Sequence, residues 1–167
     1  MDCDKHQENK WVTLFFNICD IMSQKSKDPT TKVGCVITSS VNSIISTGFN
    51  GFPVGVNDSI CDKEIKTRYV RPEKYLWTAH AEENAIALAA RNGISTNGAT
   101  LYVNRMMPCT RCTRLIIQSG IRKIFVNQDA PKETIERWKE DNNIAETMLR
   151  EAGVELNVFG FYKNLFF

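Results

Sequence analysis

The sequence has no long hydrophobic run and no large excess of charge of either sign. None of its apolar stretches reaches the roughly 20 residues that a membrane-spanning helix needs. Its N-terminal segment is polar and mixed in charge, without the apolar core of a secretory signal. A net charge of +2 over 167 residues is not the electrostatic footprint of a general nucleic-acid binder. We therefore expect a cytoplasmic protein with no membrane partner and no stable nucleic-acid partner.

The chain also lacks internal repeats and low-complexity linkers, and its length suits a single domain over residues 1–167. Six cysteines without a secretory signal indicate reduced thiols rather than disulfides. We expect the core of the domain at about 11–156 and an aromatic tail at 157–167. The tail is too short to cross a bilayer, so it is expected to pack on the body of the protein or on a partner subunit.

Hydrophobic periodicity predicts strands that alternate with helices, which is typical of a layered α/β domain. The predicted helices cover residues 11–26, 80–92, 108–120 and 134–152. The predicted strands cover residues 33–38, 43–49, 100–104, 123–126 and 154–158. A Gly/Pro-rich loop is expected at 50–56, and the charged segment 57–75 is expected to be a loop with some helix.

Two short motifs carry the candidate chemistry. They read His80-Ala81-Glu82 and, further along the chain, Pro108-Cys109-Thr110-Arg111-Cys112. Together they match H-x-E…P-C-x-x-C, the signature of zinc-dependent nucleobase deaminases. One imidazole and two thiolates supply three zinc ligands and leave a fourth position for water, as a hydrolytic zinc site requires.

Glu82 has a task in such a site that follows from charge. Two thiolates already neutralise the doubly charged metal, so bound water is acidified less than on an all-imidazole site. A carboxylate near the metal can complete the deprotonation and carry the proton onward. We therefore predict attack of a zinc-bound hydroxide on the amino-bearing ring carbon, with Glu82 as the proton shuttle and ammonia as the leaving group.

A lone C-x-x-C is more often a structural zinc corner or a redox pair. A structural site would need a fourth protein ligand, which Cys3, Cys35 or Cys61 could supply. Such a site gives Glu82 no task, so the sequence favours catalysis. Two alternatives remain open: a deaminase of a base in tRNA or single-stranded nucleic acid, and a non-catalytic structural-zinc interaction module.

Over roughly residues 11–156 the chain resembles the cytidine/deoxycytidylate deaminase superfamily, and within it the deoxycytidylate (dCMP) deaminase branch. Beyond the zinc motifs, segments 26–34, 46–53 and 116–121 carry the likeness. The resemblance implies a three-layer α/β/α fold around a five-stranded mixed sheet. It also implies a homo-oligomer that deaminates a free nucleotide, dCMP to dUMP. The implied roles are zinc binding by His80, Cys109 and Cys112 and proton transfer by Glu82.

The resemblance also assigns three substrate contacts. Asn50 would hydrogen-bond the sugar, which suits an amide because it offers a donor and an acceptor together; the alternative is a turn-forming asparagine. The Ala81 backbone N–H would bind the pyrimidine carbonyl. Lys32 would reach the 5′-phosphate, and the alternative is a solvated lysine.

One segment departs from the family pattern. Similar enzymes carry tyrosine and basic residues after the strand that follows the zinc helix, whereas residues 126–131 offer neither. Other cations could meet the phosphate or could form a solvated face. They are Arg105 and Arg111 near the cysteines, and Lys63, Lys66, Arg68 and Arg71 in the charged segment.

Overall fold

The computed structural model describes residues 2–160, in which strands and helices alternate as predicted. The helices are α1 Asp2–Ser23, α2 Lys63–Thr67, α3 Lys74–Trp77, α4 Ala81–Arg91, α5 Thr110–Gln118, α6 Lys132–Arg137 and α7 Lys139–Glu151. The strands are β1 Gly34–Thr38, β2 Ile44–Phe49, β3 Thr100–Asn104, β4 Lys123–Asn127 and β5 Glu155–Phe159. The short α2 and α3 confirm the expectation of a loop with some helix at 57–75.

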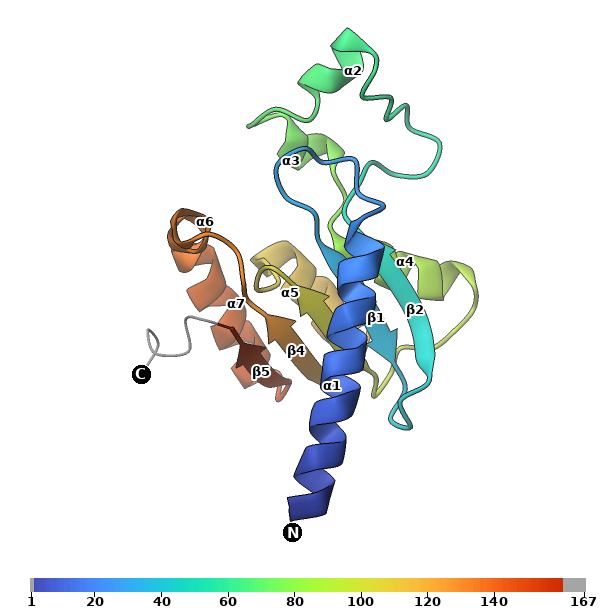
Figure 1. The fold of residues 1–167 in the computed structure, drawn as a ribbon, viewed down its shortest axis with the longest axis vertical. Helices are drawn as coiled ribbons and strands as arrows, with labels where there is room; N and C mark the ends of the chain where they lie inside the picture. Colours follow the sequence, from blue (N-terminus) through green and yellow to red (C-terminus); the bar gives the residue numbers. More distant parts are fainter. Residues whose placement is uncertain (1, 161–167) are drawn as a thin grey trace.

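The five strands form one mixed sheet in the order β2-β1-β3-β4-β5. The central strand β3 pairs antiparallel with β1 and parallel with β4, and β5 continues the parallel half. In Figure 1, α1 crosses in front of this sheet, and α4 and α5 lie behind it. The three-layer α/β/α fold and the mixed sheet predicted from the sequence are therefore confirmed.

Alternation along the strands divides the core into two layers, because successive side chains point to opposite faces of a sheet. On β3, Leu101 and Val103 pack with α4 and α5 in the larger cluster. Tyr102 points to the other face, where it packs against Phe15 and Phe16 of α1 and stacks on Phe125. Burying apolar surface on both faces fixes the helices to the sheet. The segments that lead into α4 and α5 are held in place with these helices.

Two predicted helices differ from the structure. Helix α1 begins at Asp2, well before the predicted start at residue 11. Residues 2–10 include several residue types that favour helix, but they have no apolar period from which a helix could be predicted. The predicted helix 134–152 is divided at Trp138 into α6 and α7. No glycine or proline marks that break. The Trp138 side chain packs against Tyr75 across the chain, so a tertiary contact accompanies the break.

The C-terminal expectation is only partly covered by the described residues. Phe159 belongs to β5 and packs against Phe16 and Phe125, whereas residues 161–167 lie outside the described part of the chain. None of the helices within residues 2–160 has the length and apolarity needed to cross a membrane.

Two glycines bring helices into backbone contact with the sheet. An added Cβ at Gly34 of β1 would overlap the Cys19 carbonyl of α1. At Gly48 of β2 it would overlap the Ala81 carbonyl of α4 and come within 2.6 Å of the Ala85 amide nitrogen. Because Ala81 lies in the first turn of α4, Gly48 determines how closely the N-terminus of that helix approaches the sheet.

We expect Gly48→Ala to destabilise the protein by about 1–3 kcal/mol, because the new methyl group meets backbone that cannot rotate away. Gly51→Ala is the matched control, since its Cβ would find only the Phe49 ring at 3.7 Å. Urea unfolding of both variants measures the difference. Equal stability of the two would contradict the close approach at Gly48.

Candidate active site

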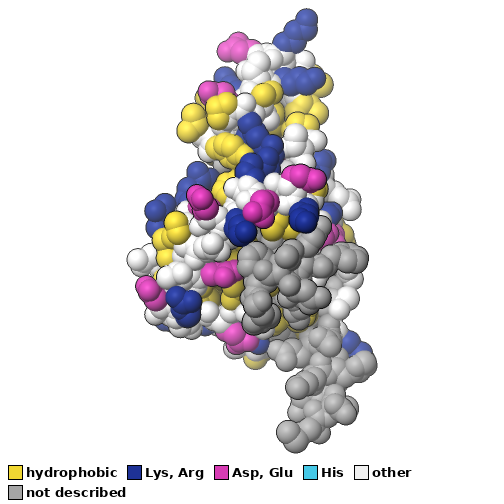
Figure 2. All heavy atoms as spheres, turned by 90° about the vertical axis from the view of Figure 1, so that its left-hand side faces the viewer, with side chains coloured by type: hydrophobic (Ala, Val, Ile, Leu, Met, Phe, Trp, Pro, Cys, Tyr) yellow, Lys and Arg dark blue, Asp and Glu magenta, His cyan; other side chains and the backbone are white. Residues whose placement is uncertain are grey.

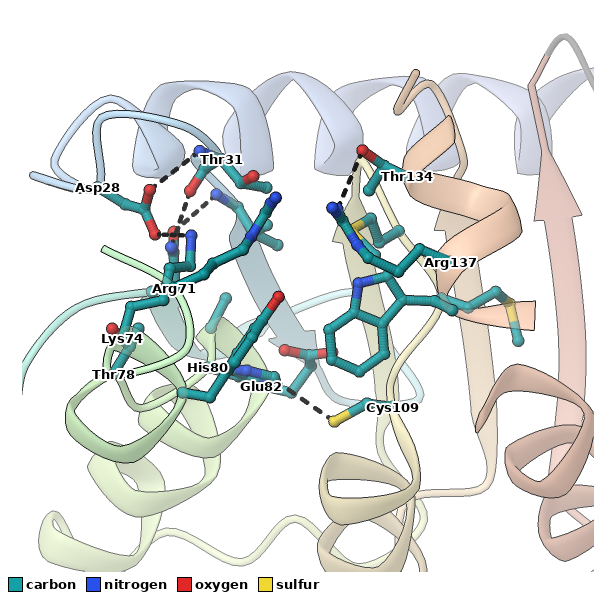
Figure 3. A pocket seen from close by; sticks show the side chains of 17 residues that line it. Asp28, Thr31, Arg71, Lys74, Thr78, His80, Glu82, Cys109, Thr134 and Arg137 are labelled. Carbon is teal, nitrogen blue, oxygen red and sulfur yellow. Dashed lines mark hydrogen bonds and ion pairs between the residues drawn. The ribbon is translucent and has the colours of Figure 1, made fainter. Parts of the chain in front are cut away.

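The site lies at one end of the strands, where β3 and β4 end and where α4 and α5 begin (Figure 1). A pocket at these strand ends has His80, Glu82 and Cys109 at its base (Figure 3). In parallel α/β units, ligands bind at the carboxyl ends of the strands, because loops and helix N-termini converge there. The two sequence motifs are thus brought together at the position where such folds bind ligands.

His80 is the residue that precedes α4, and its backbone is extended at φ −76° and ψ 162°. Its backbone N–H donates to the Glu83 carboxylate at 2.7 Å, a contact that holds the start of the helix. The side chain is therefore fixed at a helix N-terminus, as the sequence predicts.

Cys109 precedes α5 in the same way, and Cys112 lies in its first turn. The Nδ1 atom of His80 lies 3.4 Å from the Sγ atoms of both Cys109 and Cys112. A tetrahedral zinc ion with Zn–S of about 2.3 Å and Zn–N of about 2.0 Å separates nitrogen and sulfur ligands by about 3.5 Å. The donor atoms thus fit zinc in both type and spacing.

Among the side chains that the structure describes, none adds a fourth ligand to this group. Within this part of the chain, His80, Cys109 and Cys112 form the only cluster of three or more such groups close enough to share an ion. Cys35 is buried in the same core cluster but is not part of the ligand group, Cys61 is exposed, and the Cys3 side chain is outside the described part. Three protein ligands and an open position are typical of catalytic zinc sites.

The pKa values of the two cysteine thiols are coupled and are shifted in opposite directions. A hydrogen bond from the Cys112 thiol, reinforced by His80, lowers the pKa of Cys109 to about 4. The same hydrogen bond, together with burial, raises the pKa of Cys112. One thiolate is therefore already present for a metal at neutral pH, and the second forms when a cation replaces the thiol proton of Cys112.

Glu82 is buried at the base of the pocket and is not part of the cluster of metal-binding groups. Burial raises the pKa of its carboxyl to about 7. A carboxyl with a pKa near the working pH can both accept and return a proton. This position suits the proton shuttle predicted from the sequence.

Asn50 and Ala81 both line the pocket. The Asn50 amide accepts from the Val33 N–H at 2.8 Å and donates to the Thr31 carbonyl at 2.9 Å, so it fastens the neighbouring loop. One N–H and one lone pair of the amide remain for another partner. The Ala81 N–H lies in the first turn of α4, where helix geometry provides no acceptor.

Lys32 is not among the residues that line the pocket, although its neighbours Thr31 and Val33 are. Arg71 and Arg137 line it instead, extending from opposite walls into the space above Glu82 (Figure 3). Arg71 was one of several cations considered from the sequence, whereas Arg137 was missed. No local pattern singled it out inside a predicted helix.

The other cation of the pocket is neutralised. Lys74 donates to Asp28 at 2.8 Å and to Thr30 at 2.9 Å, and its side chain and that of Asp28 are almost fully buried. Within the described residues neither Arg71 nor Arg137 has a carboxylate partner, although Arg137 donates weakly to Thr134 at 3.3 Å. The upper part of the pocket therefore carries two positive charges that no carboxylate of the described residues pairs.

The remaining cations considered from the sequence have other contacts or lie at the surface. Arg105 pairs with Asp129, Arg111 with Glu83, and the Arg68 guanidinium lies over the Trp77 ring. Lys63 and Lys66 are exposed on α2. The structure thus reduces the candidates for anion binding in the pocket to two arginines.

Fold and site together define a zinc-dependent hydrolytic deaminase. A family model described as the cytidine and deoxycytidylate deaminase zinc-binding region matches residues 9–128. The chain belongs to this family, so the resemblance, the zinc cofactor and the enzyme class predicted from the sequence are confirmed.

Individual relatives agree with this family. The chain is 30% identical over 160 residues to deoxycytidylate deaminase of Mus musculus, covering 95% of this chain and 85% of the relative. It is 40% identical over 148 residues to an uncharacterized deaminase of Aliivibrio fischeri, covering 89% and 92%. A crystal structure of dCMP deaminase from cyanophage S-TIM5 has the same fold, with a TM-score of 0.65 at 22% identity, over 90% of this chain and 98% of that one.

We expect the purified protein to contain about one zinc ion per chain, because three protein ligands converge on a single point. Replacing Cys109 and Cys112 together by alanine should abolish zinc retention, as measured by elemental analysis after dialysis. Cys61→Ala is the control, since that thiol is exposed and outside the cluster. Full zinc content in the double variant would disprove the assignment of these ligands.

Proposed function

We propose that the protein hydrolyses dCMP to dUMP and ammonia. The observation that supports this most is the pocket itself, which joins a three-ligand zinc site and a buried carboxylate at its base to two unpaired arginines above them. A cytosine nucleotide has an exocyclic amino group to be removed at one end and an anionic phosphate at the other. Relatives of comparable length are named deoxycytidylate deaminases, among them the mouse protein.

Glu82 is the proposed catalytic residue. A zinc ion held by the three ligands would act as a Lewis acid and make water at its open position more acidic. The Glu82 carboxylate takes a proton from the attacking water and gives it to the ring nitrogen next to the amino-bearing carbon. It then takes a second proton from the new hydroxyl group on that carbon, which becomes the carbonyl, and delivers this proton to the departing amino group. The balance is one water consumed and one ammonia released. The Ala81 N–H, at the positive end of α4, is suited to hold the pyrimidine carbonyl during these steps.

The phosphate is assigned to Arg71 and Arg137 in this proposal. Guanidinium groups bind phosphate oxygens through paired, charge-assisted hydrogen bonds. An anion between the two walls also removes the repulsion between two unpaired cations. Asn50, which also lines the pocket, is suited to contact the sugar with the N–H and the lone pair that its bonds to Val33 and Thr31 leave over.

A deaminase of nucleic acid finds less support. Binding of single strands generally relies on a basic groove with aromatic side chains on which the bases stack. In Figure 2, Lys and Arg side chains are interspersed with Asp and Glu, and the apolar side chains gather on the upper part of the face. We therefore propose a free nucleotide as the substrate, with no stable nucleic-acid partner.

We also propose a homo-oligomer in a reducing compartment such as the cytoplasm. Helix α1 exposes large apolar side chains, with Trp11 at 41%, Leu14 at 44% and Ile21 at 62% of their full accessibility. Self-association would remove this surface from water. The described cysteines are all free thiols. Light scattering at two concentrations tests the oligomer.

Glu82→Gln should lower kcat for dCMP by roughly 10²- to 10⁴-fold, since the amide has the same size but cannot relay protons. Zinc content should stay near that of the wild type, because Glu82 is not one of the proposed ligands. An ammonia-release assay and elemental analysis on the same preparation separate the two effects. Turnover within a few-fold of the wild type would mean that another group moves the protons.

Arg71→Ala and Arg137→Ala should each weaken transition-state binding of dCMP by about 1.5–3 kcal/mol, because each removes a charge-assisted hydrogen bond. The kcat/KM for deoxycytidine, which has no phosphate, should change little. Lys32→Ala is the matched comparison, as the sequence assigns the phosphate to Lys32 and the structure leaves that side chain exposed.

The pattern of losses distinguishes the assignments. A loss specific to dCMP in Lys32→Ala alone would favour the assignment made from the sequence. Equal losses on nucleoside and nucleotide in the arginine variants would mean that these residues support the pocket rather than the phosphate. Equal wild-type efficiency on both substrates would exclude phosphate recognition.

A further inference from the structure

The two residues between the zinc cysteines each hold the turn that carries the sulfurs. Thr110 donates from its backbone N–H to Asp141 at 2.8 Å and from its hydroxyl to the same carboxylate at 2.7 Å. Cys109 makes no side-chain cap on α5. The carboxylate that caps this helix therefore comes from α7, a different element of the fold.

Arg111 makes the second connection. Its Nη2 donates to Glu83 at 2.8 Å and to the Thr78 carbonyl at 3.3 Å. The Glu83 carboxylate also accepts from the His80 N–H at 2.7 Å. One carboxylate thus joins the cysteine turn of α5 to the backbone of the histidine ligand on α4.

We propose that Asp141 and the Arg111–Glu83 pair are positioning residues, which hold the three ligands at zinc-binding distances before the metal arrives. None of the three belongs to the ligand cluster. The inference depends on the ligand assignment proposed for His80, Cys109 and Cys112 and not on the identity of the substrate.

The physical basis is the cost of arranging the ligands. They come from two helices that are far apart in the sequence, and an unrestrained arrangement would make the metal order them on binding. The side chains of Arg111 and Glu83 are partly exposed, at 45% and 21%, so their ion pair contributes modestly to folding stability. Its main effect is then expected on metal affinity, where outer contacts commonly account for about 10- to 100-fold.

The experiment measures the zinc dissociation constant of the folded protein by competition with a chromophoric chelator. Asp141→Ala and Arg111→Gln should each raise the constant by about 10- to 100-fold. Asp141→Asn keeps one carbonyl acceptor, so it should fall between Asp141→Ala and the wild type, and it serves if the alanine variant does not fold. The absorption of the cobalt-substituted variants should stay that of a tetrahedral thiolate site.

Two controls isolate position from charge. Glu140→Ala, next to Asp141, and Arg114→Gln, on α5 beyond the cysteines, remove the same charges from exposed side chains that do not join the ligand helices. Both should bind zinc like the wild type. A double variant, Arg111→Gln with Glu83→Gln, should lose no more affinity than the weaker-binding single variant, because Arg111 is linked to the His80 backbone through Glu83.

A purely structural role gives a different result. It would lower the melting temperatures of the metal-free and zinc-bound forms equally and leave the dissociation constant within twofold of the wild type, which would overturn the proposal. Equal losses in the charge controls would also overturn it, in favour of a long-range charge effect. Failure of the ligand assignment itself is recognised separately, by zinc retention without Cys109 and Cys112.

Discussion

Two helices of this protein meet with their N-terminal ends, and the rest of the site depends on the charge between them. Each helix N-terminus carries about half a positive charge, so α4 and α5 repel one another where they converge. The convergence is offset by anionic groups: the thiolate of Cys109 and the carboxylates of Glu82, Glu83 and Asp141 all lie at or near the first turns. A cation can bind here only if the negative charge of the cysteine thiolates exceeds the partial positive charge of the two helix ends.

The pocket above the metal site has the opposite balance of charge. Asp28 neutralises Lys74 inside the protein, while Arg71 and Arg137 remain without acidic partners among the described residues. A buried pair contributes little net stability compared with an apolar pair, but it fixes which cations stay available to a ligand. The base of the pocket therefore favours a cation and its upper part favours an anion.

The sequence was sufficient for the parts of the protein that depend on local patterns. The strands, the helix starts at His80 and Cys109 and the metal-binding group follow from periodicity and motif spacing. The break at Trp138 and the place of Arg137 in the pocket could not be found in this way. Trp138 packs against Tyr75, far away in the sequence, and Arg137 lines a pocket that several distant segments form together. Lys32 is not among the residues that line the pocket, and its place in a motif does not determine where its side chain points, so its contact with the phosphate stays a prediction.

Gly34 and Gly48 hold the sheet between α1 and α4 by backbone contact on its two faces. Where backbone meets backbone, the distance between layers does not depend on the volume of any side chain. Substitutions farther along either helix can therefore change core volume without changing how far His80 lies from the sheet. The start of α4, which carries the histidine ligand, is thereby set by backbone contact at Gly48, a position where any larger residue would meet main chain.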